Sequence, residues 1–169
     1  MNYLRHISLS LLLLVPFSPV AAEPTGSAEG YHRIALSAGE LGLADKLRYP
    51  GRYGIEYQAR PYTSWKLIPA IGFAWAESGA NLTYAALRRD FWLTERWSIT
   101  PTTGLGAFQE SEELKLGSEL EFRSGIEAAY NFRNHYRLGL GFFHVSNAGI
   151  GERNPGSESL IAFFAVPFR

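Results

Sequence analysis

Apolar and polar residues alternate along most of the chain, in segments of about ten residues. Successive side chains of a β-strand point to opposite faces, so this alternation predicts strands with one apolar face. The segment 117–132 has the clearest pattern, with Leu120 and Phe122 on one face. Glu121 and Arg123 share the other face. The eight predicted strands are 29–39, 49–59, 66–77, 82–93, 97–109, 117–132, 135–147 and 157–168.

The connections between these segments alternate in length. Residues 94–96 and 133–134 form short turns, whereas 40–48, 110–116 and 147–156 are longer and polar. Strands of about ten residues, joined alternately by short and long connections, are typical of outer-membrane barrels. A strand of a water-soluble sandwich also alternates, with its apolar face in a core. The segment 82–93 is ambiguous, because three charged residues, Arg88, Arg89 and Asp90, are adjacent in it.

The first 22 residues have the pattern of a secretory signal peptide. A short polar start with Arg5 is followed by a mostly apolar stretch, and Val20-Ala21-Ala22 offers small residues for cleavage. We therefore expect a signal peptide over 1–22 and a single domain over 23–169. Export and many aromatic residues favour the membrane interpretation. We predict an all-β fold, an eight-stranded antiparallel transmembrane β-barrel of the bacterial outer membrane.

Composition narrows the function. The chain has no cysteine, which excludes a disulfide framework in an exported protein. It is 14% aromatic and has zero formal net charge, with no basic patch that would indicate a nucleic-acid partner. The sequence shows no Cys/His cluster or Asp-rich loop of the kind that binds metal ions, and we expect neither a metal nor a cofactor.

The segment 135–147 combines an apolar row with two reactive side chains. Taken every second residue, the row is Leu138, Leu140, Phe142, His144 and Ser146. If both termini lie in the periplasm, this strand ends at the external leaflet, so His144 and Ser146 lie beside the lipopolysaccharide. A base and a nucleophile on a lipid-facing wall suit an enzyme whose substrate is a membrane lipid.

Glu158 extends the apolar row of the next strand toward the same rim. If Ser146 pairs opposite Glu158, then His144 is diagonal to Glu158 and within side-chain reach. Ser146 would be the nucleophile, His144 the general base and Glu158 the acid that orients the imidazole. Taken singly, each of the three is also an ordinary polar residue of a membrane interface.

The run His144-Val-Ser146-Asn147-Ala-Gly149, followed by Asn154-Pro-Gly and Glu158, resembles the signature of the outer-membrane lipid A 3-O-deacylases. The resemblance implies an eight-stranded barrel with a Ser-His-Glu triad on its lipid-facing wall. It also implies an oxyanion hole formed by Asn154 and a backbone N–H near Gly149, with Asn147 in support. The motif covers only residues 138–158.

The function that we expect is hydrolysis of the 3-hydroxyacyl ester at position 3 of lipid A. The expected partners are lipid A, or lipopolysaccharide, and outer-membrane lipids, with a homodimer as a further possibility. Two alternatives remain open at this point. One is an outer-membrane phospholipase or acyltransferase, and the other is a small structural or adhesive barrel without enzymatic activity.

Overall fold

The computed structural model describes residues 30–42, 51–62 and 64–169. The predicted signal peptide and most of the first long connection lie outside these ranges. No helix in the described part of the chain is long and apolar enough to cross a membrane. The strands are β1 (His32–Leu41), β2 (Gly51–Gln58), β3 (Leu67–Ala76), β4 (Asn81–Arg89), β5 (Phe91–Trp92), β6 (Trp97–Gln109), β7 (Leu120–Asn131), β8 (Arg137–Ser146) and β9 (Ser157–Phe168).

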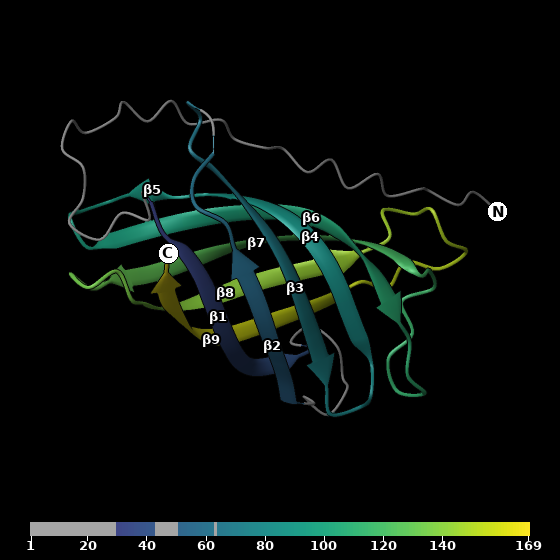
Figure 1. The fold of residues 1–169 in the computed structure, drawn as a ribbon. Coiled ribbons are helices and arrows are strands. Elements are labelled where there is room, and N and C mark those ends of the chain that lie inside the picture. The colour runs from purple at the N-terminus through teal and green to yellow at the C-terminus, as the bar shows by residue number, and fades with distance from the viewer. Residues whose placement is uncertain (1–29, 43–50, 63) are drawn as a thin grey trace.

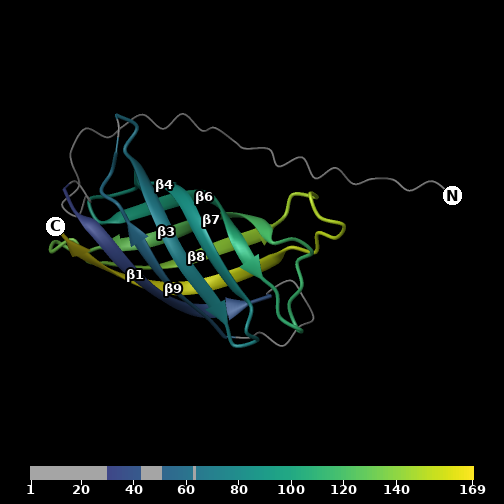
Figure 2. The same cartoon turned by 45° about the vertical axis from the view of Figure 1, so that its right-hand side comes forward.

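The strands form one closed antiparallel barrel, seen from two sides in Figures 1 and 2. Each long strand pairs with its neighbour along the chain, β1 pairs with β9, and β4 pairs with β6. Eight long strands therefore close the wall, while the two-residue β5 pairs only with β6. The predicted fold class is confirmed, and each long strand falls within about four residues of its predicted bounds.

β5 is the continuation of β4 after a break at Asp90. Arg88 pairs with Thr102 and Phe91 with Ile99, so the two strands keep one register against β6. Asp90 accepts a hydrogen bond from Thr100 Oγ1 at 2.6 Å and forms an ion pair with Arg137 at 2.9 Å. The adjacent charges of Arg88, Arg89 and Asp90 are therefore compatible with strands. Arg88 pairs with carboxylates inside the barrel, Arg89 is exposed, and Asp90 pairs with Arg137.

The wall is apolar outside and largely polar inside. Along β7, Leu120, Phe122 and Ile126 are exposed, whereas Glu121 and Arg123 are buried in the barrel. The same alternation holds along β9, where the outward row includes Leu160 and Phe164. An outer surface of this kind fits hydrocarbon, where every backbone group must be paired within the wall.

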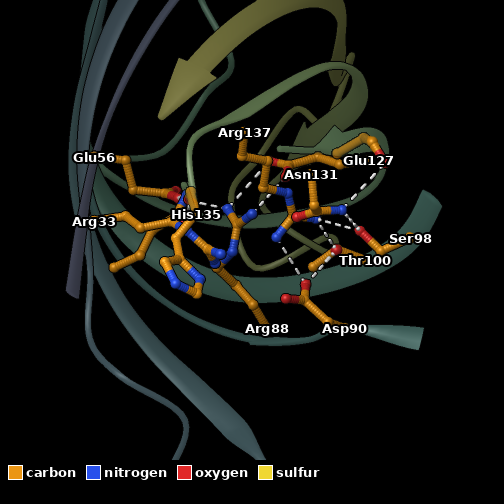
Figure 3. Close-up of polar contacts among 12 residues, drawn as sticks. Arg33, Glu56, Arg88, Asp90, Ser98, Thr100, Glu127, Asn131, His135 and Arg137 are labelled. Carbon is orange, nitrogen blue, oxygen red and sulfur yellow. Dashed lines mark hydrogen bonds and ion pairs between the residues drawn. The ribbon is translucent and has the colours of Figure 1, made fainter. Parts of the chain in front are cut away.

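The barrel interior contains an apolar cluster and a polar network. Near one end, Leu114 and Leu116 from the β6–β7 connection pack against Ala74, Leu82 and Phe108 of the wall. Near the other end lies a network of buried charges and hydroxyls, whose side chains point toward one another in Figure 3. Its members include Arg33, Glu56, Arg88, Asp90, Ser98, Thr100, Glu127, Asn131 and Arg137.

The two ends of the barrel differ in their connections. The C-terminus and the start of β1 lie at one end, and the β6–β7 and β8–β9 connections lie at the other (Figure 2). With the termini on the periplasmic side, β8 runs outward and β9 returns. In that orientation, which the sequence analysis predicts, the rim that carries His144, Ser146 and Glu158 is the external one.

Candidate active site

A histidine and a glutamate form a hydrogen-bonded pair on the outer wall, at the rim that carries the β8–β9 connection. His144 Nδ1 lies 3.0 Å from Glu158 Oε1, and the two side chains are 42% and 23% exposed. Both sit on the outward face of adjacent strands, β8 and β9. The contact expected from the sequence is therefore present. A carboxylate that accepts the Nδ1–H leaves the lone pair of Nε2 available to take a proton.

The strand register that we predicted for this hairpin is wrong by two residues. His144 is directly opposite Glu158, and Val145 opposite Ser157 is the last pair before the loop. Three loop residues, Ala148, Gly149 and Gly156, have positive φ angles of 55°, 81° and 70°, so the connection does not close as a simple hairpin. Direct pairing brings the carboxylate closer to the imidazole than a diagonal position would.

Ser146 is the last residue of β8 and lies on the same outward face as His144. It is half-buried, and its register partner is Phe122 on β7. No hydrogen bond joins Ser146 to His144 among the described residues. Two residues along a strand separate their Cα atoms by roughly 7 Å, a distance that the long imidazole and the short hydroxyl can bridge together. The strand therefore places both side chains on one face, and a side-chain rotation would be needed to bring them into contact.

Asn147 anchors the connection that follows Ser146. Its side chain is fully buried, and Nδ2 donates to Leu116 O at 3.0 Å and to Arg153 O at 2.7 Å. Its Oδ1 accepts from Gly149 N–H at 2.9 Å. One amide thus ties the β8–β9 connection to itself and to the β6–β7 connection. A fixed loop beside a nucleophile is what preorganised catalysis requires.

Asn154 folds back onto the residue after Ser146. Its Oδ1 accepts the backbone N–H of Asn147 at 3.0 Å. Because an N–H can only donate, the oxygen of the amide must face it, and the NH₂ group is directed elsewhere. Gly149 N–H is already donated to Asn147. Of the two expected oxyanion donors, Asn154 Nδ2 is thus the one without a hydrogen-bond partner among the described residues.

The sequence reasoning missed Gly156 as a neighbour of the imidazole. Gly156 is buried with φ of +70°, and a Cβ at this position would lie 2.9 Å from His144 Cε1 and 3.5 Å from Nε2. The glycine therefore leaves room for the ring edge that carries Nε2. The run Asn154-Pro-Gly contained the signal, but only the fold shows what the missing side chain would touch.

The inward face of β8 and β9 is separated by the wall from His144 and Glu158. Val145, Ser157 and Ser159 alternate with His144 and Glu158, and they point inward to line a cavity of about 40 Å³ in the barrel mouth. The wall separates this cavity from the outward groups, so it is not part of the same site. The described residues contain no group of three or more His, Cys, Asp or Glu side chains placed to hold a metal ion.

Comparison with known proteins gives a consistent set of relatives. Residues 51–167 match the family described as lipid A 3-O-deacylase (PagL). Lipid A deacylase PagL of Pseudomonas aeruginosa PAO1 is 36% identical over 66 residues, covering 38% of this chain and 38% of that protein. The PagL protein of Bordetella bronchiseptica RB50 is 30% identical over 80 residues, covering 46% of this chain and 45% of that protein. These alignments span less than half the length of either relative.

Solved structures agree on the fold. The crystal structure of the outer membrane enzyme PagL superposes with a TM-score of 0.66 at 23% identity, covering 80% of this chain and 99% of that chain. A de novo designed transmembrane β-barrel superposes with a TM-score of 0.52 at 14% identity, covering 83% of this chain and 97% of the design. The family match covers most of the chain and includes β8, the β8–β9 connection and β9 up to Pro167. The chain belongs to the lipid A 3-O-deacylase (PagL) family, and its fold is that of an outer-membrane β-barrel.

Proposed function

We propose that the protein is a serine esterase that hydrolyses the 3-hydroxyacyl ester at position 3 of lipid A. One observation carries the proposal: a carboxylate-bound histidine and a serine share the lipid-facing side of the wall at its external rim. A site with that orientation lies beside the lipids of the surrounding leaflet. The family supplies the expected substrate, and the geometry supplies a way to attack it.

In the first half of the reaction, Ser146 Oγ attacks the ester carbonyl while His144 Nε2 accepts its proton. Glu158 accepts the Nδ1–H, which keeps the ring in the tautomer with a free Nε2 and stabilises the imidazolium that forms. The Ser146–His144 contact forms as substrate binds, since catalytic hydrogen bonds often tighten only in the complex. His144 then gives its proton to the departing sugar oxygen, leaving an acyl-enzyme.

Negative charge collects on the carbonyl oxygen during each attack. Asn154 Nδ2 is the proposed donor to this oxygen, because its Oδ1 is held by Asn147 and its NH₂ is unengaged. Gly149 N–H is the second donor when it is shared between Asn147 Oδ1 and the oxyanion. Water activated by His144 then releases the 3-hydroxy fatty acid and restores Ser146.

Replacement of the nucleophile tests this function. Ser146→Ala should abolish removal of the position 3 acyl chain, measured by mass spectrometry of lipid A from a lipopolysaccharide-producing host that expresses each variant. Ser159→Ala makes the same chemical change on the inward face of the neighbouring strand and should retain full activity. Both variants should keep the heat-dependent gel mobility of a folded barrel. Continued deacylation by a folded Ser146→Ala protein would overturn the proposal.

A further inference from the structure

One hydroxyl interrupts the lipid-facing row of β7 next to the catalytic histidine. The outward neighbours of Ser124 along the strand are Phe122 and Ile126, both exposed and apolar. Ser124 is exposed and has no hydrogen-bond partner among the described residues. A hydroxyl that faces hydrocarbon without a partner costs free energy, so a partner from the leaflet would be favoured.

The strand register places Ser124 on the same level of the wall as the proposed base and acid. Ser124 pairs directly with His144, which pairs directly with Glu158. Side chains directly opposite in an antiparallel pair have Cβ atoms roughly 4.5–5.5 Å apart. Ser146 pairs with Phe122, so Ser124 lies diagonally below it at roughly 7–8 Å, farther from the external rim.

A bound lipid A molecule has its sugar at the rim and its acyl chain running toward the membrane centre. The ester carbonyl must lie roughly 3 Å from Ser146 Oγ for attack. From there the chain would run along the outer wall over Ser124 and His144 and then over Ile126 and Phe142, which are themselves paired. The 3-hydroxyl is attached two carbons beyond the carbonyl, on the part of the chain that would face Ser124 in this orientation.

We propose that Ser124 is a specificity-determining residue that hydrogen-bonds the 3-hydroxyl of the acyl chain. This inference rests on the proposed function and deepens it. Ser124 is both donor and acceptor, as is the substrate hydroxyl, so either can donate. The bond forms where water is scarce, so it discriminates against a chain that lacks the hydroxyl.

The experiment compares two synthetic lipid A analogues that differ only in the 3-hydroxyl of the position 3 chain, in identical mixed micelles. Wild-type protein should prefer the hydroxylated analogue in kcat/KM. Ser124→Ala should reduce this preference by about 3- to 10-fold, the discrimination expected of one neutral hydrogen bond. Ser124→Thr keeps the hydroxyl and should restore most of the preference.

Thr103→Val is the matched control. Thr103 faces outward on β6 and pairs with Ser124 on the side away from His144. The Thr103→Val variant loses a lipid-facing hydroxyl one strand farther from the acyl path, so its preference for the hydroxylated analogue should stay at the wild-type value. An equal loss of activity on both analogues in Ser124→Ala, or an unchanged preference, would overturn the inference. If wild-type protein cleaves neither analogue, the proposed function itself fails.

Discussion

The barrel has two carboxylate clusters, one inside and one on the outer wall, and they differ in the contacts that their carboxylates make. Inside, Glu56 accepts bonds from Arg88, from Gln58 at 2.9 Å and from Tyr84 at 2.8 Å, and Glu127 also binds Arg88. On the outer wall, Glu158 has one side-chain partner within the described part of the chain, His144, whose side chain is 42% exposed.

The difference lies in how many partners each carboxylate has. Both oxygens of Glu56 are engaged and the whole cluster is buried, so its groups are fixed and have no room for a substrate. Glu158 contacts one ring nitrogen of His144, and the other ring nitrogen has no hydrogen-bond partner among the described residues. A buried carboxylate with several hydrogen-bond donors contributes to stability, whereas a carboxylate–histidine pair at a surface can react.

Removal of the outer carboxylate charge should have the largest effect on activity. Glu158→Gln should lower kcat by about 10⁴-fold, because an amide can donate to Nδ1 and favour the tautomer that blocks Nε2. Its stability should stay close to wild type, since the pair is partly exposed. The measurement is lipid A deacylation at saturating substrate, together with urea unfolding of the refolded barrel.

Glu40→Gln is the control for that change. Glu40 is an exposed, outward carboxylate on β1, paired with Leu160 rather than with the histidine. It should retain wild-type kcat. Comparable losses in Glu40→Gln and Glu158→Gln would show that general rim charge, and not the pair with His144, supports activity.

Removal of the buried Arg88 charge should lower the stability of the barrel and not its activity. Arg88→Met leaves Glu56 and Glu127 buried without their shared partner, a change that costs about 3–5 kcal/mol in buried ion clusters. The free energy of unfolding can be measured from a urea titration followed by tryptophan fluorescence. The fraction that folds should keep its kcat, because the outer wall is unchanged.

Arg89→Met makes the same substitution one residue later, on the exposed face of β4. It should shift the unfolding free energy by less than about 1 kcal/mol, the ordinary range of surface changes. Equal stability losses in Arg88→Met and Arg89→Met would contradict a structural role for the inner cluster.

The sequence predicted the outer wall better than the inner cluster. The lipid-facing rows follow from period-two alternation, which is local, so the strands and the outward parity of His144, Ser146 and Glu158 could be predicted. The partners of Arg88 come from β2 and β7, and no local pattern indicates which buried charges meet. The predicted β8–β9 register failed for a related reason, because loop residues with positive φ determine where pairing ends.

The smallest expected effect tests the space around the outer imidazole. Gly156→Ala places a Cβ 2.9 Å from His144 Cε1, so the ring must shift from its position on Glu158. We expect kcat/KM to fall about tenfold, or ~1.4 kcal/mol of transition-state stabilisation.

The left-handed backbone adds its own cost, about 1–2 kcal/mol of stability for a residue with a Cβ. Gly79→Ala measures that cost alone, since Gly79 has φ of +89° and nothing within 4 Å of the added carbon. Both variants should therefore unfold at similarly lowered urea concentrations, but only Gly156→Ala should lose activity. If Gly79→Ala lost as much activity, backbone strain at the rim would explain the defect. Wild-type activity in Gly156→Ala would mean that catalysis tolerates a displaced imidazole. The position of His144 on the outer wall would then be less constrained than the positions of the groups in the inner cluster.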